Sequence, residues 1–283
     1  MNRRSFITWS AALLVAGGVQ AADPQKLRLA LLPDENAATI IQNAQPLKTY
    51  LEKRLGREVE IIVSTDYSSM IEAMRFGRID VAYFGPLSYV LARSKSEIEA
   101  FAAGTTKGSP TYTSVVIAGA RSGVSSIAEI KGKVVAYGDT ASTSSHLVPR
   151  ALLEERGLVA KRDYEPVYLG QHDAVARAVE SGKAPVGALS RPIFDSLVKA
   201  GKIDAAKVRV IAETAPIPNY PIAVQSKLSP YLKGELRAAF LDMRDPAILK
   251  SFRADGFAPM SDHDYDLLRQ TAKVLNLDLA RLQ

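Results

Sequence analysis

The stretch LRLALL (Leu27–Leu32) is an apolar run of strand length, and it opens the alternating pattern that decides the fold. A helical pattern follows over Thr39–Leu55, with apolar residues three and four positions apart. Two further strands are predicted at Val59–Val63 and Ile79–Phe84, with a helix over Ser68–Arg75 between them. Short apolar runs that alternate with helices are typical of parallel βαβ units. This part of the chain is therefore predicted to form one doubly wound α/β half.

A second α/β series begins after the long strand-like run Thr111–Ala120. Its predicted strands and helices are, in order, 133–137, 144–156, 166–169, 173–180 and 186–189. The strand Ile222–Gln225 then leads to three helical patterns, over 230–243, 246–254 and 263–275. The second series thus repeats the architecture of the first, and a helical C-terminal part follows.

Two α/β series predict two lobes, and the chain is expected to cross between them near Thr111–Val116 and again near Asn219–Val224. The length of 283 residues also favours two domains. The expected boundaries are 22–112 plus 223–283 for the first lobe and 113–222 for the second. A ligand cleft would lie between the lobes, although two independent doubly wound domains would give the same pattern.

The composition excludes several classes of function. The sequence has 0 Cys, which rules out a disulfide scaffold, a thiolate metal site and a cysteine nucleophile. Its 36 Lys and Arg against 30 Asp and Glu give a formal charge of +6, which suits an anionic partner. These charges are scattered, and no basic cluster carries interleaved aromatic residues, so nucleic acid is not an expected partner.

The first segment, residues 1–21, is interpreted as a secretory signal peptide. Arg3 and Arg4 precede the apolar stretch Ala11–Val19, and small residues before the predicted cut after Ala21 suit a signal peptidase. The apolar run is shorter than the roughly 20 residues that a membrane span needs. The segment Asn2–Ile7 also resembles a twin-arginine export signal. The mature protein is therefore expected in the periplasm.

The stretch GDTASTSS (Gly138–Ser145) carries the most informative chemistry, because it follows a predicted strand and precedes a helix. The first turn of a helix leaves backbone N–H groups unpaired and carries a partial positive charge. Hydroxyl donors at that place can bind a tetrahedral oxyanion. Alternatively, one serine caps the helix and the others are solvated turn residues.

Other polar residues also lie beyond the ends of predicted strands. His172 follows one strand and could donate to an oxyanion, or it could serve only as a turn or capping residue. Tyr67 precedes the second predicted helix, and Phe84 and Ser88 follow the third strand. Ligands of open α/β sheets bind beyond the carboxyl ends of the strands. These residues are candidates for ligand contacts.

Enzyme and metal motifs are missing where they would be expected. The acidic group Asp262–Asp266 contains one histidine, but Ser261 and Asp264 have the spacing of a helix capping box, which is the favoured interpretation. The sequence has no G-x-S-x-G, H-E-x-x-H, P-loop or dinucleotide-binding motif. We therefore expect no metal, no cofactor and no enzymatic activity.

Several of these segments together resemble the periplasmic phosphonate-, phosphite- and phosphate-binding proteins of ABC importers. The segments that carry the resemblance are Asp66-Tyr67 with Met74–Phe76, Asp80–Ser88, Ser142–Ser144 with Leu147–Pro149, Gly170–Ala174 and Ile217–Ile222. The resemblance implies a bilobed type II periplasmic-binding-protein fold, with two doubly wound lobes joined by two crossing strands. It also implies a monomer that passes its ligand to an ABC permease in the inner membrane.

The resemblance implies ligand contacts as well. The implied ligand-binding residues are Tyr67, Phe84, Ser88, Ser142, Thr143, Ser144, His172, Arg191 and Tyr220. In this interpretation the Ser142–Ser144 turn holds the oxyanion first, and closure brings Tyr67 and the segment around Phe84 and Ser88 from the other lobe. Arg191 would supply an additional cation, unless it is a solvent-facing helix residue.

Two departures from the family pattern bear on the ligand. Members that take aminoalkylphosphonates have carboxylates near two positions at which this chain has Arg191 and Tyr220. An ammonium buried without a partner is strongly unfavourable. The predicted ligand therefore lacks an amine: phosphite, phosphate, or a small alkyl- or carboxy-phosphonate. Phe84 stands where the family often has tyrosine, so one hydroxyl donor is absent.

Other functions remain open at this point. A receptor that presents its ligand to a membrane sensor kinase would have the same sequence features. An exported phosphoester hydrolase would need a nucleophile or a metal set. A related fold in pyrimidine-synthesising enzymes is disfavoured by the signal peptide and by the lack of cysteine.

Overall fold

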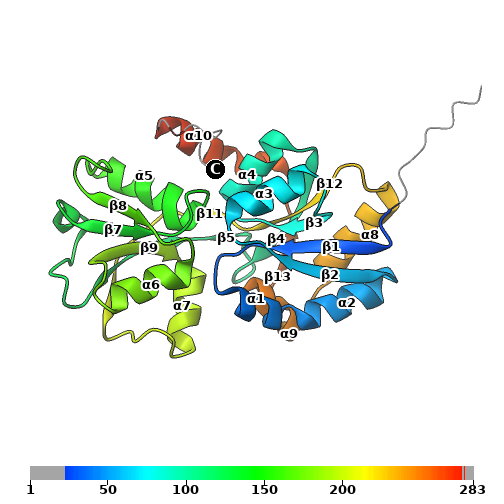
Figure 1. The fold of residues 1–283 in the computed structure, drawn as a ribbon, viewed down its shortest axis with the longest axis horizontal. Coiled ribbons are helices and arrows are strands. Elements are labelled where there is room, and N and C mark those ends of the chain that lie inside the picture. The colour runs from blue at the N-terminus through cyan, green and yellow to red at the C-terminus, as the bar shows by residue number, and fades with distance from the viewer. Residues whose placement is uncertain (1–22, 276, 278–283) are drawn as a thin grey trace, which may run out of the picture.

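The computed structural model describes residues 23–275 and 277, and it contains two α/β lobes side by side (Figure 1). The predicted signal peptide, residues 1–21, lies outside the described residues. Within the described part of the chain, no helix combines the length and the apolar character that a membrane crossing requires. The α/β class and the two-lobe arrangement predicted from the sequence are confirmed.

The first lobe is built on a six-stranded sheet of order β13-β4-β12-β3-β1-β2. Its strands are β1 (Lys26–Leu31), β2 (Glu58–Val63), β3 (Val81–Tyr83), β4 (Ile98–Thr105), β12 (Pro221–Gln225) and β13 (Gly256–Pro259). Strand β1 pairs in parallel with β2 and β3, whereas β12 is antiparallel to β3 and β4. The late strands β12 and β13 therefore complete a sheet that the N-terminal part begins.

Seven α-helices belong to this lobe within the described residues. They are α1 (Ala37–Asn43), α2 (Gln45–Leu55), α3 (Tyr67–Arg75), α4 (Pro86–Lys95), α8 (Pro230–Leu241), α9 (Pro246–Leu249) and α10 (Asp266–Val274). The single helix predicted over 39–55 is in fact α1 and α2, with a break at Ala44. Pro46 is the reason, because proline lacks an N–H group and fits only the first turn of a helix.

The second lobe has a five-stranded sheet of order β10-β6-β9-β7-β8. Its strands are β6 (Ser114–Gly119), β7 (Val134–Tyr137), β8 (Glu165–Tyr168), β9 (Val186–Ser190) and β10 (Val208–Glu213). Its α-helices are α5 (Val148–Glu155), α6 (His172–Glu180) and α7 (Arg191–Lys199). The sequence predicted neither α7 nor β10, and in the first lobe it missed α4, β4 and β13 as well.

The two lobes are joined by a pair of short strands, β5 (Thr111–Tyr112) and β11 (Ile217–Pro218), which pair antiparallel. The two predicted crossings of the chain are thus confirmed. The predicted boundary at residue 222 differs slightly from the strand pairing. Pro221 pairs with Ala103 and Ile222 with Ala102, so both residues complete the ladder of the first lobe.

Close packing fixes the helix that carries His172. A Cβ atom on Gly187 in β9 would lie 2.6 Å from Val175 Cγ1 and 2.9 Å from Val179 Cγ2. Both valines belong to α6, so the lack of a side chain on Gly187 lets this helix lie directly on the sheet. The N-terminus of α6 consequently points into the space between the lobes, where His172 N–H donates to Asp34 O at 2.9 Å.

Candidate functional site

The hydroxyl-rich turn after β7 leads into one turn of π-helix, Thr143–Leu147. Ser142 caps it, because its Oγ accepts a hydrogen bond from Ser145 N–H at 3.1 Å. Leu147 N–H donates to Ser142 O at 3.0 Å, which is the wider spacing of a π-turn. The hydroxyl residues from Ser142 to Ser145 are buried, so the alternative of solvated turn residues is wrong, although Ser142 does cap the helix.

Within the described residues, three buried hydroxyls at this turn and around it make no hydrogen bond of ordinary distance and angle: those of Tyr67, Tyr112 and Ser144. They are close to other hydroxyls, Tyr112 to that of Ser144 and Tyr67 to that of Ser142. They come from α3, from the crossing strand β5 and from the π-turn. Burial raises the pKa of Tyr112, and the neighbouring hydroxyls of Ser144, Tyr220 and Thr143 act in the opposite direction. Buried polar groups are almost always hydrogen-bonded. These hydroxyls are therefore the strongest candidates for ligand contacts in the described structure.

His172 lies beside the same turn as a neutral donor. Its Nδ1 accepts a hydrogen bond from Ser190 N–H at 3.1 Å, so the proton of the neutral ring is on Nε2. Nε2 is 3.4 Å from Ser142 Oγ. Burial lowers the pKa of His172 to about 3, with a smaller contribution from the charge of Arg253. The ring therefore stays uncharged at neutral pH and presents one N–H group.

Hydrogen bonds across the cleft hold the lobes together. Leu87 N–H, in the first turn of α4, donates to Thr143 Oγ1 at 2.7 Å. Tyr67 N–H, in the first turn of α3, lies 3.4 Å from Asp139 Oδ2. Both helices thus direct their N-termini at the second lobe. The predicted residue Thr143 takes part in this closure contact as well as lying at the site.

Phe84 and Ser88 are buried near the cleft and offer a ligand no free donor, whereas Tyr220, also buried, keeps its hydroxyl beside that of Tyr112. Ser88 Oγ donates to Gly85 O at 2.9 Å, so its hydroxyl is already used inside α4. Tyr220 packs its ring 5.3 Å from the rings of Tyr83 and Tyr112. These residues form the wall of the site.

Arg191 does not join the other predicted residues. Its side chain is 38% exposed and pairs with Asp195 and with Glu213, at 2.9 Å in both cases. Asp195 lies in α7, where it also lines an outer groove together with Glu35 and Arg253, and Glu213 lies at the end of β10. The structure therefore favours the alternative, a solvent-facing helix residue, because Asp195 and Glu213 already pair with the guanidinium of Arg191.

The structure instead places another arginine at the inner end of the cleft. A small cavity of about 10 Å³ there is lined by Tyr83, Thr106, Tyr112, Ser190, Pro192, Asn219, Tyr220, Phe252 and Arg253. Arg253 Nη2 pairs with Asp34 Oδ2 and Nη1 with Glu35 Oε2, both at 2.6 Å. Burial raises the pKa of Asp34 to about 6, and the charge of Arg253 opposes this rise.

The sequence interpretation missed four residues of this site. Asp34 and Glu35 follow β1, so the rule that ligands bind at strand ends would have found them. Tyr112 lies in a crossing strand that was considered only as a connection. Arg253 follows a short 3-10 helix, where no sequence pattern marks it.

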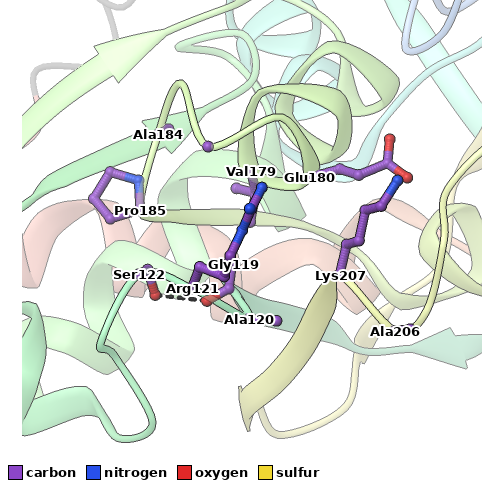
Figure 2. Close-up of a pocket in the computed structure, with 11 residues that line it drawn as sticks. Gly119, Ala120, Arg121, Ser122, Val179, Glu180, Ala184, Pro185, Ala206 and Lys207 are labelled. Atoms are coloured by element: carbon purple, nitrogen blue, oxygen red, sulfur yellow. Dashed lines mark hydrogen bonds between the residues drawn. The ribbon is translucent and has the colours of Figure 1, made fainter.

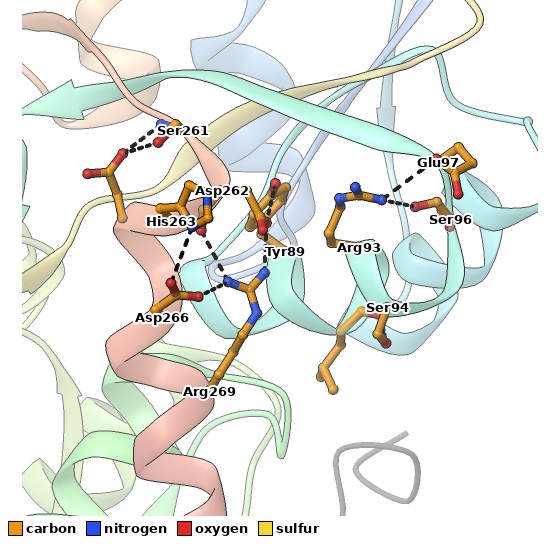
Figure 3. A network of polar contacts seen from close by, with 12 residues as sticks. Tyr89, Arg93, Ser94, Ser96, Glu97, Ser261, Asp262, His263, Asp266 and Arg269 are labelled. Atoms are coloured by element: carbon orange, nitrogen blue, oxygen red, sulfur yellow. Dashed lines mark hydrogen bonds and ion pairs between the residues drawn. The ribbon is translucent and has the colours of Figure 1, made fainter.

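Two other features lie away from the cleft. A hollow of about 380 Å³ at the far edge of the second lobe is lined mainly by turn residues, including Arg121 and Lys207 (Figure 2). The acidic segment around Asp262 forms a polar network with Arg269 (Figure 3). Ser261 there is part of a capping box, as predicted. In the described part of the chain no cluster of three or more acidic or histidine residues could hold a metal ion.

Two α/β lobes with buried polar side chains between them are the arrangement of a substrate-binding protein. A model of the family described as "ABC transporter, phosphonate, periplasmic substrate-binding protein" matches residues 29–265, and the chain belongs to this family. The family resemblance stated from the sequence is thus confirmed. The family consists of substrate-binding proteins of ABC transporters, which work in the periplasm.

Individual relatives agree with this assignment. The phosphate-import protein PhnD of Mycolicibacterium smegmatis is 28% identical over 89% of this chain and 86% of its own length. The probable phosphite-binding protein PhnD1 of Prochlorococcus marinus is 24% identical over 97% and 98%. A 1.52 Å resolution structure of PhnD1 from Prochlorococcus marinus in complex with methylphosphonate has a TM-score of 0.83 at 22% identity, and the match covers 90% of this chain and 100% of that chain. The fold is therefore of the type II periplasmic-binding class.

Proposed function

We propose that this protein binds one small phosphorus oxyanion without an amine between its lobes and delivers it to an ABC permease. The observation that carries the proposal is the group of buried hydroxyls without partners, Tyr67, Tyr112 and Ser144, at the π-turn. The remaining contacts would come from Ser142, Thr143 and the Nε2–H group of His172. Tyr220, Phe84 and Ser88 would shape the wall.

The proposed site holds its anion with neutral donors. His172 is neutral, and the guanidinium of Arg253 is already paired with two carboxylates. Hydrogen bonds to a charged acceptor are about twice as strong as those between neutral groups. A hydroxyl that loses its water on closure therefore gains most when the ligand is an anion.

Closure is the expected response to the ligand. The hydroxyls of Tyr67 and Ser144 belong to different lobes, so only the closed form brings both to one ligand. A ligand shifts an open–closed equilibrium by its differential affinity for the closed form. We propose that the permease recognises the closed form and that the protein acts as a monomer. Residues 1–21 would direct export, and Arg3 and Arg4 would send the protein through the twin-arginine route.

A thermal-shift panel tests the proposal. The panel contains phosphate, phosphite, methylphosphonate, 2-aminoethylphosphonate and sulfate, and the stabilisation should follow RT ln(1 + [L]/Kd). We expect large shifts from amine-free phosphorus oxyanions and a small one from sulfate. The measurement uses the chain without residues 1–21, and release of phosphate from a phosphoester serves as the control for hydrolysis. No shift from any phosphorus compound would refute the proposal, and turnover would favour the hydrolase.

A further inference from the structure

Two carboxylates, those of Asp34 and Glu35, lie beside the proposed anion site, where negative charge would repel the ligand unless it is neutralised. Asp34 is 2% exposed, and Glu35 lies next to it at the end of β1. Both pair with Arg253, whose side chain is 19% exposed. Arg253 has φ 51°, in the left-handed region that non-glycine residues seldom adopt. The backbone therefore accepts strain at the residue that brings this cation to the carboxylates.

The guanidinium lies where the substituent of a bound ligand would end. Arg253 lines the small inner cavity together with Tyr112 and Tyr220. It also lines an outer groove of about 800 Å³, whose walls include Glu35 and Pro192. A ligand whose oxyanion contacts Tyr112 and the π-turn would therefore direct its other end toward Arg253.

Without Arg253, this end of the cleft would suit a cation. Asp34 and Glu35 together carry two negative charges, and both carboxylates pair with Arg253. Three lysines line the outer groove with Glu35, but within the described residues none of them forms an ion pair with either carboxylate: Lys199, Lys202 and Lys250. An ammonium group on the ligand would need the same carboxylates. Because Arg253 already occupies them, such an ammonium would be enclosed next to a like charge, which is costly in a desolvated site.

We propose that Arg253 is a specificity-determining residue: a built-in cation that takes the place of a ligand amine and so excludes aminoalkylphosphonates. The inference rests on the proposed function and adds the group that sets its selectivity. It adds a paired cation at the cleft to the first basis of the preference for amine-free ligands, which was the lack of carboxylates at the positions of Arg191 and Tyr220.

A matched ligand pair tests this directly. Propylphosphonate and 2-aminoethylphosphonate have the same chain length and differ by a methyl group against an ammonium group. For the wild-type protein, calorimetry should give an affinity for propylphosphonate at least about 100-fold higher. Arg253→Met removes the cation and keeps much of the apolar volume, and it should reduce this ratio at least about 10-fold because Asp34 and Glu35 are freed.

Control variants separate charge from packing. Arg253→Lys keeps a cation and should keep the wild-type ratio. Asp34→Asn and Glu35→Gln added to Arg253→Met remove the freed carboxylates and should restore the preference for propylphosphonate. Should Arg253→Met fail to fold, Arg253→Asn is the second variant, because asparagine adopts the left-handed conformation readily.

The outcomes separate a failure of the proposed function from a failure of the role assigned to Arg253. A wild-type protein that binds neither phosphite nor any phosphonate refutes the proposed function. A protein that binds phosphite and propylphosphonate, but binds the amino compound equally well or better, overturns the role of Arg253. The same holds if the ratio is unchanged in both Arg253→Met and Arg253→Asn while both still bind propylphosphonate.

Discussion

Replacing Ser144 with alanine should have opposite effects on folding and on binding. The Ser144 hydroxyl is buried and has no hydrogen-bond partner in the described structure. A buried polar group without a partner costs about 1–3 kcal/mol. The free energy of unfolding of ligand-free Ser144→Ala should therefore be unchanged or higher by about 1 kcal/mol.

Ligand affinity should fall in the same variant. A hydrogen bond to a charged group contributes about 1.5–3 kcal/mol, so the Kd for phosphite or methylphosphonate should rise about 10- to 150-fold. Urea unfolding without ligand measures the first effect, and titration calorimetry measures the second. A stabilised protein with weakened binding is the signature of a hydroxyl that the fold leaves free for a ligand.

Ser145 is the matched control, one position further along the same turn. Its Oγ accepts a hydrogen bond from Gly138 N–H at 2.8 Å and donates to Ala188 O. Ser145→Ala should therefore destabilise the protein by about 1–3 kcal/mol, since it leaves buried partners unpaired. If Ser144→Ala destabilises the protein as much as Ser145→Ala and binds the ligand as tightly as the wild type, the site has been misplaced.

Further predictions concern the same cleft and its support. Tyr67→Phe should lower the ligand affinity about 10-fold in calorimetry, with little change in the free energy of unfolding. Unchanged affinity would show that the Tyr67 hydroxyl does not contact the ligand. Arg191→Ala should leave the ligand affinity within about 2-fold of the wild type. A larger loss of affinity would show that Arg191 contributes to ligand binding. Gly187→Ala should destabilise the protein by about 1–3 kcal/mol in urea, because its Cβ would lie 2.6 Å from Val175 Cγ1; full stability would show that α6 can move away freely. Burial lowers the pKa of His146 from 6.5 to about 4. As the pH falls, the unfolded chain therefore takes up this proton at a higher pH than the folded protein does, and the free energy of unfolding decreases below pH 6.5. Between pH 7 and pH 5 this group should cost about 2 kcal/mol, and urea unfolding of His146→Gln should show a loss smaller by that amount; equal losses would contradict the lowered pKa.

Much of the fold could be predicted from local patterns. Apolar runs of strand length and helical spacing mark elements whose residues are neighbours in the chain, and most of the predicted elements exist. The errors have local causes too. Pro46 divides one predicted helix, and α4 and β4 were missed because buried, nearly continuous apolar runs lack a clear period.

The sequence by itself determined the α/β class, the two crossings and the place of the hydroxyl-rich turn, because strand and helix periods are properties of consecutive residues. The tertiary structure decided which hydroxyls are free. The Ser145 hydroxyl bonds to Ala188 in β9 and to Gly138, whereas the Ser144 hydroxyl makes no hydrogen bond of ordinary geometry in the part of the chain that the structure describes.

Only the tertiary structure could place the charges as well. Asp34 and Arg253 are 219 positions apart, and their 2.6 Å contact depends on how β1 and the C-terminal part meet at the cleft. Arg191 directly follows the cleft residue Ser190 in the sequence, but its guanidinium pairs with Asp195 and Glu213. A hydrogen bond or ion pair depends on direction and on distance in space, and a pattern along the chain contains neither.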